Sequence, residues 1–481
     1  MNDAHLPPII QGGMGVAVSD WRLARVVSRL GQLGVVSGTA IDLVCARRLQ
    51  LGDPGGHVRR ALACFPIPEM AQRVIRTFYV PGGKPQGTPF RPVPRYSLRP
   101  GRALVELTIV ANFAEVYLAK EGHDGRVGIN YLRKIELPIP FACYGAMLAG
   151  VDHILMGAGN PAELPALLDR LAGHRQVALP VRVQGATSAD GDARVEFDPA
   201  ALWEAPPALR SPRFEAIVAS VDLATALAAD PATRPDGFVV EGSPAGGHNA
   251  PPRGPRLLDD AGQLVYGERD VVVPEQMMAI GVPFWMAGGY GSPDGLAAAL
   301  AGGATGIQAG TAFAFCAESG MAAPLKRAVL EHVARGDTRV RTDPRISPTG
   351  FPFKTVDLEG TVARDDVYAD RTRLCDLGVL RSPYRKADTG IGYRCPAEPV
   401  DVYERRGGRA QNTEGRRCLC NALLATAGYG QERLDGYAEP AIVTAGTDLS
   451  AVRHLSAVHP GYTAADVVAY LLEGADSDRG A

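Results

Sequence analysis

The chain has 481 residues, of which 46% are hydrophobic, and its 50 Lys and Arg against 52 Asp and Glu give a formal net charge of −2. This length fits one large α/β barrel with an appended region, and the apolar fraction can fill a sizeable core. Because there is no basic excess and aromatic residues make up only 6%, we expect no nucleic-acid partner. The chain has no run of about 18 apolar residues and no signal-peptide pattern, which predicts a cytoplasmic protein without a membrane partner.

Short apolar runs alternate with helical stretches from the N-terminus to about residue 330. This alternation predicts βα units and a parallel sheet. The helical stretches include residues 21–30, 161–168, 221–229 and 294–301. Eight strands are expected, at residues 8–11, 33–37, 126–130, 153–156, 214–218, 237–240, 282–286 and 306–309. Eight such units favour an α/β fold of the (β/α)8 TIM barrel class, and an open doubly wound sheet is the alternative.

Two insertions and a C-terminal region interrupt this rhythm. Residues 79–100 are rich in Pro, Gly and Arg and predict an irregular surface loop. Within residues 180–212, alternation at 181–184 and 193–197 around a turn predicts an inserted β-hairpin. We therefore assign residues 1–325 to the barrel and residues 326–481 to an irregular, α-containing C-terminal lid or extension, which ends in a helix at 464–472.

The most informative segment is residues 241–248, which read Glu-Gly-Ser-Pro-Ala-Gly-Gly-His. A β-type run at 237–240 leads directly into it, and its glycines allow a sharp turn and close approach to a ring. The segment ends in His248, at the carboxyl end of a strand, where barrel enzymes place their chemistry. A hydrogen-bonded loop histidine with no catalytic role is the alternative.

Glycine turns follow the seventh and eighth predicted strands. Ala287, Gly288 and Gly289 follow one strand, and Gly310 and Thr311 follow the next. Glycine turns there expose backbone N–H groups, and this is the usual phosphate position of such barrels. These turns therefore predict a phosphate site; taken one at a time, they are equally consistent with tight βα turns.

Six segments occur in the order known from one enzyme family: residues 8–15, 128–130, 157–161, 241–248, 287–289 and 308–313. Over about residues 7–320 the chain resembles the nitronate monooxygenase (2-nitropropane dioxygenase) family, which is related to the flavin-dependent enoyl-acyl-carrier-protein reductases. The resemblance implies a (β/α)8 barrel with a non-covalent FMN cofactor over its mouth.

The resemblance also implies roles for individual residues. Gly12, Gly13 and Met14 would line the flavin ring, Asn130 would hydrogen-bond it, and Ser220 would lie near the ribityl chain. Gly246 and Gly247 would let the backbone reach the ring, and His248 would act on the substrate as acid, base or oxyanion partner. The FMN site is expected to comprise Gly12, Gly13, Met14, Asn130, Ser220, Gly246, Gly247, Ala287, Gly288, Gly289, Gln308, Gly310 and Thr311.

The activity expected from the resemblance is FMN-dependent oxidation of a nitronate-type carbon acid with O2. Two alternatives stay open: an NAD(P)H-dependent enoyl-thioester reductase of a fatty-acid or polyketide system, and a non-catalytic flavin-binding subunit. The corresponding partners are a small-molecule substrate with O2 or NAD(P)H, and either an acyl-carrier protein or a second copy of the chain.

Four of the eight cysteines, Cys375, Cys395, Cys418 and Cys420, fall within 46 residues of an otherwise cysteine-poor chain. Four thiolates could bind zinc or an iron–sulfur cluster. The spacing lacks a doubled C-x2-C pattern, so buried free thiols are the alternative and no metal ligand is assigned.

Overall fold

The computed structural model describes residues 6–187, 192–387 and 390–473. Its centre is a closed barrel of eight parallel strands in the order β1-β11-β10-β8-β7-β4-β3-β2. The strands are β1 (Ile9–Gln11), β2 (Leu33–Ser37), β3 (Val127–Leu132), β4 (His153–Gly157), β7 (Arg213–Val218), β8 (Gly237–Glu241), β10 (Phe284–Ala287) and β11 (Gly306–Ala309). The predicted (β/α)8 barrel is confirmed, and the pairing of β1 with β11 excludes the open sheet.

The eight predicted strands agree with the observed ones to within two residues at each end. They are recognisable because the barrel strands are covered on both faces, so that β2 and β4 are buried at every position. One small core fills the barrel interior, with Trp285 among its fully buried residues. The Trp285 indole N–H donates to the Pro7 carbonyl over 2.9 Å and ties the first strand to the seventh.

Helices surround the barrel. They include α1 (Trp21–Arg29), α2 (Ile41–Gln50), α3 (His57–Ala63), α4 (Pro68–Phe78), α5 (Arg102–Lys120), α6 (Ile139–Leu148), α7 (Leu164–Ala172), α8 (Val221–Ala229), α9 (Pro274–Met278) and α10 (Pro293–Ala301). Serine hydroxyls at Ser220 and Ser292 cap α8 and α10. The C-terminal helix α17 (Ala464–Leu472) packs against both α1 and α10 and so completes the ring between the last and the first βα units.

The inserted loop at 79–100 contains no helix or strand, as predicted. The inserted hairpin is shifted from its predicted position. It pairs β5 (Val177–Pro180) with β6 (Arg194–Phe197), so the expected first strand at 181–184 is wrong. Gln184, the last residue of that expected strand, pairs instead with Tyr384 of the C-terminal region. Most of the predicted turn, residues 188–191, lies outside the described residues.

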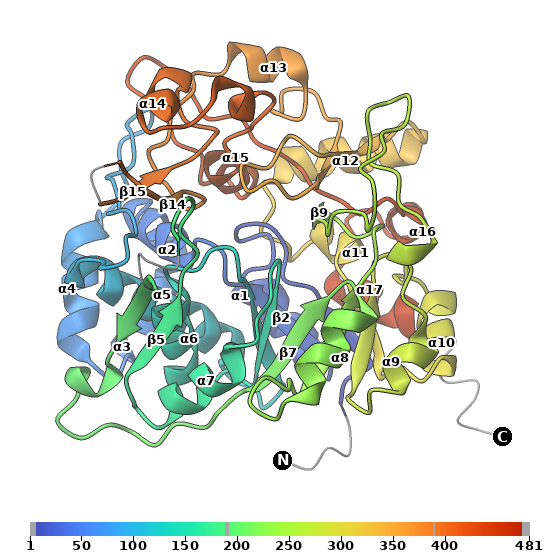
Figure 1. Ribbon diagram of the computed structural model, residues 1–481, viewed down its shortest axis with the longest axis horizontal. Helices are drawn as coiled ribbons and strands as arrows, with labels where there is room; N and C mark the ends of the chain where they lie inside the picture. The colour runs from blue at the N-terminus through green and yellow to red at the C-terminus, as the bar shows by residue number, and fades with distance from the viewer. Residues whose placement is uncertain (1–5, 188–191, 388–389, 474–481) are drawn as a thin grey trace.

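Beyond the barrel, the chain forms short elements that gather at one end of the molecule (Figure 1). They are α12 (Ala323–Arg335), β12 (Val340–Asp343), β13 (Phe353–Val356), α13 (Asp365–Asp370), β14 (Ser382–Arg385), β15 (Ile391–Arg394), α14 (Val400–Arg405), α15 (Leu419–Thr426) and α16 (Ser450–Val458). The strand β13 pairs antiparallel with β9 (Gly247–His248), which joins this region to the glycine-rich loop after β8. No helix among the described residues is both long and apolar enough to cross a membrane.

Candidate active site

A cavity of about 500 Å3 lies at the carboxyl ends of the barrel strands. Its walls come from the segments that follow the barrel strands, and its cover comes from the C-terminal region, including Phe351, Leu419 and Thr444. The residues predicted for the cofactor and for catalysis all line this one space: Gly12, Gly13, Met14, Asn130, Ser220, Gly246, Gly247, His248, Ala287, Gly288, Gly289, Gln308, Gly310 and Thr311. The structure therefore brings the predicted residues together, while their individual roles stay predictions.

The glycine turns after β10 and β11 offer free backbone donors. The N–H groups of Gly288, Gly289 and Gly310 form no hydrogen bond with any described residue. Thr311 accepts a hydrogen bond from the Gly446 N–H over 2.8 Å, so its own hydroxyl proton remains available. Gly288 has a φ of 78°, and a Cβ there would lie 2.7 Å from the Gly242 carbonyl oxygen. Such a set of donors beside a close-packed turn suits a phosphate group.

Polar side chains at the cavity wall also lack partners. The buried amide oxygens of Asn130 and Gln308 have no hydrogen-bond partner in the described part of the chain. Gly13 packs so closely that a Cβ on it would lie 2.5 Å from the Asn130 Cβ. Because buried polar atoms are rarely left unsatisfied, the orphaned oxygens indicate a ligand with hydrogen-bond donors. The free glycine N–H groups could bind a phosphate, and the free amide oxygens could accept hydrogen bonds from a polar ring. Together these two sets of groups fit FMN.

Ser220 and Gly246 also have structural tasks. The Ser220 hydroxyl accepts from the Leu223 N–H over 3.1 Å at the start of α8. A Cβ on Gly246 would lie 2.8 Å from the carbonyl carbon of Ala445, so this glycine admits the C-terminal segment at close range. Gly246 thus has a second role beside the expected access of the backbone to a ring, namely contact with the cover of the cavity.

His248 is held by both the barrel and the C-terminal region. Its Nε2 lies 2.7 Å from the Ser347 hydroxyl, which in turn lies 2.8 Å from the Thr349 hydroxyl. The Phe353 ring packs against the imidazole at a centroid distance of 4.6 Å. Burial first, and the nearby Lys134 second, hold the pKa of His248 well below its usual range. The imidazole is therefore neutral at neutral pH, with a ring-nitrogen lone pair available, and the same shift makes it a weaker base than an exposed histidine.

Two further ionisable groups lie near His248. Burial raises the pKa of Glu241, the last residue of β8, to about 7, although Lys134 opposes the shift. Burial lowers the pKa of Lys134 well below its ordinary value. The Lys134 amine has no hydrogen-bond partner among the described residues and lies 4.4 Å from the centre of the Phe351 ring. An unpaired amine and a half-ionised carboxyl beside one imidazole are typical of a catalytic site.

Sequence reasoning missed Lys134, Ser347 and Phe351 as members of the site. Lys134 could have been found, because it follows directly after a barrel strand, where barrel enzymes place functional groups. Ser347 and Phe351 could not, because their contacts with His248 span about a hundred residues of chain. A pattern within a short stretch of sequence does not reveal contacts between residues that lie so far apart in the chain.

Comparison with known proteins bears on this site. Residues 213–343, which include β8, the His248 loop and both glycine turns, match the nitronate monooxygenase family model. The resemblance to the nitronate monooxygenase family is confirmed. A probable nitronate monooxygenase of Bacillus subtilis (strain 168) is 37% identical over 107 residues, which are 22% of this chain. That match spans only 29% of the relative's own length, so the activity of the whole relative is not transferred.

Solved structures give similarities along nearly the whole chain. FabK from Thermotoga maritima aligns over 98% of this chain and 95% of its own, with 17% identity and a TM-score of 0.49. Nitroalkane oxidase from Streptomyces ansochromogenes covers 99% of this chain and 98% of its own, with 17% identity and a TM-score of 0.43. The enoyl reductase domain of MlnA from Bacillus amyloliquefaciens covers 98% and 94%, with 14% identity and a TM-score of 0.46. Since each score is below 0.5, no functional conclusion rests on these similarities.

Proposed function

We propose that the protein is an FMN-dependent oxidoreductase that oxidises a nitronate-type carbon acid with O2. The observation that carries the proposal is one cavity shared by the free amides after β10 and β11 and by His248 after β8. The match of residues 213–343 to the nitronate monooxygenase family supports the same activity.

In this proposal the phosphate of FMN is bound by the N–H groups of Gly288, Gly289 and Gly310 and by the Thr311 hydroxyl. Asn130 and Gln308, whose amide oxygens are unpaired, accept hydrogen bonds from the ring system. When bound, FMN supplies the electron transfer, and the protein supplies orientation and electrostatics.

The chain's own residues then act on the substrate. When the substrate enters as the neutral nitroalkane, His248 accepts its α-proton, whereas a nitronate has already lost that proton and needs no base; Ser347 fixes the orientation of the imidazole through its hydrogen bond. The Lys134 amine, close to both Glu241 and His248 and without a hydrogen-bond partner in the described part of the chain, can donate to an electron-rich substrate oxygen, as a nitronate has. Phe351, Phe353 and the segment at Ala445 cover the cavity and limit the access of water.

Substrate-dependent turnover of purified holoprotein tests the proposal against its alternatives. Consumption of O2 on addition of propionate 3-nitronate, without any nicotinamide, is the expected result. Oxidation of NAD(P)H that depends on an enoyl thioester, free or on an acyl-carrier protein, would replace the proposal by the reductase alternative. Bound FMN that neither substrate reduces would indicate a non-catalytic flavin-binding subunit.

A further inference from the structure

The four cysteines of the C-terminal region come together beside the active-site cavity. Cys375, Cys395, Cys418 and Cys420 all line a second cavity of about 10 Å3. Cys395 and Cys418 are only 4% and 7% exposed. The remaining cysteines, Cys45, Cys64, Cys143 and Cys316, are not among the residues that line it. The fold has therefore collected in one place the cysteines of the C-terminal region and none from the barrel.

We propose that these four cysteines bind one tetrahedral metal ion of the zinc class. Four thiolates form a closed structural site for Zn2+, with zinc–sulfur distances of about 2.3 Å. The enclosed space is about that of one water molecule, which admits a single ion and not the eight atoms of a cubane iron–sulfur cluster.

The thiols lie in two neighbouring pairs, Cys375 with Cys395 and Cys418 with Cys420. As they stand, no three His, Cys, Asp or Glu side chains in the described ranges have metal-holding spacing. The thiols must therefore turn toward the cavity centre to bind one ion. Binding releases four protons, and rotation of the thiolates toward the cavity centre completes the site.

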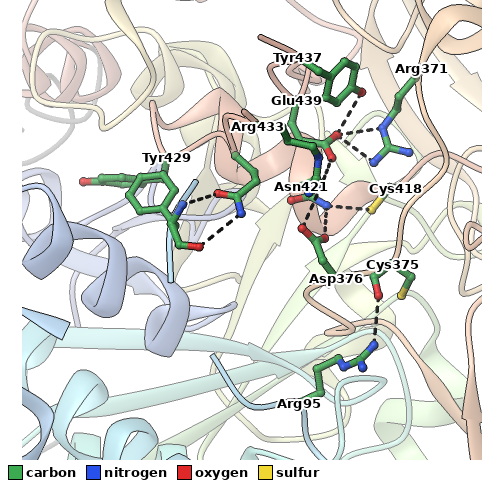
Figure 2. Close-up of polar contacts among 12 residues, drawn as sticks. Arg95, Arg371, Cys375, Asp376, Cys418, Asn421, Tyr429, Arg433, Tyr437 and Glu439 are labelled. Atoms are coloured by element: carbon green, nitrogen blue, oxygen red, sulfur yellow. Dashed lines mark hydrogen bonds and ion pairs between the residues drawn. The ribbon is translucent and has the colours of Figure 1, made fainter. Parts of the chain in front are cut away.

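A hydrogen bond to sulfur prepares one of the four ligands, Cys418. The Asn421 side-chain amide lies 3.6 Å from the Cys418 sulfur, and its other contact is to Asp376 at 2.7 Å (Figure 2). Partners of this kind hold metal ligands in place. A buried apolar thiol in an ordinary core needs none of them.

The charged side chains around the four cysteines also suit a negatively charged zinc–thiolate complex. One Zn2+ with four thiolates carries two negative charges. Arg95 and Arg381 lie together at Gly378, beside the cluster, and neither forms an ion pair with a carboxylate in the described residues. Arg95 donates to the Cys375 carbonyl over 3.1 Å (Figure 2), and Arg381 lines the small cavity. The neighbouring Arg371 and Arg433 are paired with Glu439. Two uncompensated guanidinium groups match the two charges of the proposed complex.

The ion would stabilise the cover of the active site. Between Cys375 and Cys420 the regular elements are short, with four residues in β14 and four in β15. Such a segment forms little core of its own and benefits from a metal cross-link. Leu419 and Cys420 also line the large cavity. The metal would thus fix the wall of the active site without contacting the reacting groups.

Metal analysis of the full-length protein tests the proposal. The protein is purified under reducing conditions without chelator, incubated with Zn2+ and freed of excess metal, and its metal content is measured by mass spectrometry. We expect one zinc ion per chain. Cys395→Ser and Cys418→Ser should each lose the ion, whereas the control Cys64→Ser, at an exposed thiol, should retain it.

If the serine variants do not fold, the wild-type protein still decides the question. Replacement of zinc by Co2+ should produce the intense visible bands of tetrahedral cobalt thiolate, at longer wavelengths than flavin absorbs. Reduced wild-type protein without zinc, iron together with acid-labile sulfide, or zinc that survives both serine substitutions would each overturn the proposal. None of these results depends on flavin content or turnover, so failure here is distinct from failure of the proposed function.

Discussion

At the scale of single residues, burial is the main cause of the pKa shifts of three ionisable groups in the site. His248, Glu241 and Lys134 lie near one another, and in each case burial is the largest cause of the pKa shift. Burial disfavours the charged form, so it lowers the pKa of the imidazole and of the amine and raises the pKa of the carboxyl. Burial thus favours the neutral form of all three groups.

Substitution of His248 tests its role as base. With a neutral nitroalkane as substrate, His248→Asn should bind FMN as the wild-type protein does but lower kcat/KM at least about 100-fold, because general-base catalysis typically contributes that much. Flavin content and steady-state rates of O2 consumption measure both effects. His332→Asn is the matched control, since His332 lies on α12 and pairs with Asp337 at 2.8 Å. An unchanged rate in His248→Asn would remove the histidine from the mechanism.

Glu241 predicts a pH dependence of stability. Its folded pKa of about 7 lies above its ordinary value of 4.5, so its stabilising contribution is fully present below pH 4.5 and is lost as the pH rises through 7. The loss over the whole range is on the order of 3 kcal/mol. Urea unfolding at pH 5 and pH 8 should therefore show a smaller difference in Glu241→Gln than in the wild type. Equal differences in the two proteins would contradict the assigned ionisation.

At the scale of elements, the barrel strands and their order in the chain could be predicted because each is a nearly continuous apolar run. The hairpin could be predicted only in part. Val181 and Gln184 have strand-like alternation, but the partner that Gln184 takes, Tyr384, lies two hundred residues further along the chain. Propensity locates a strand, whereas the register and the partner depend on tertiary contacts.

The turn after β10 offers a test at this scale. Gly288→Ala would place a Cβ 2.7 Å from the Gly242 oxygen and 3.0 Å from the Ala245 nitrogen, so it should displace the His248 loop and weaken FMN binding at least about tenfold. Gly281→Ala is the matched control. It precedes the same strand with a similar φ of 71°, but its Cβ would meet nothing within 4 Å.

Flavin titration followed by fluorescence measures both glycine variants. Both should lose about 1 kcal/mol of stability from the left-handed backbone conformation. Only Gly288→Ala should lose affinity for FMN. Equal affinities in the two variants would show that the turn does not form the cofactor site.

At the scale of the whole molecule, the cover of the cavity is the part that the sequence could not predict in detail. The C-terminal region reaches the site through single contacts, such as Gly446 to Thr311 and Phe353 to His248. Its last helix, α17, lies where a helix was expected at residues 464–472, yet its contacts with both α10 and α1 were not predicted. The residues predicted for the cofactor gather in one cavity because each lies near or just after the carboxyl end of a barrel strand.

The most direct test of the central claim is the absorbance spectrum of the purified protein, with titration of FMN into any flavin-free fraction. The account predicts oxidised flavin bands near about 370 and 450 nm, released on denaturation as FMN. It also predicts a higher Tm with FMN than without, since a ligand that binds only the folded state stabilises it. Protein that is colourless and neither binds nor is stabilised by added FMN would contradict the account.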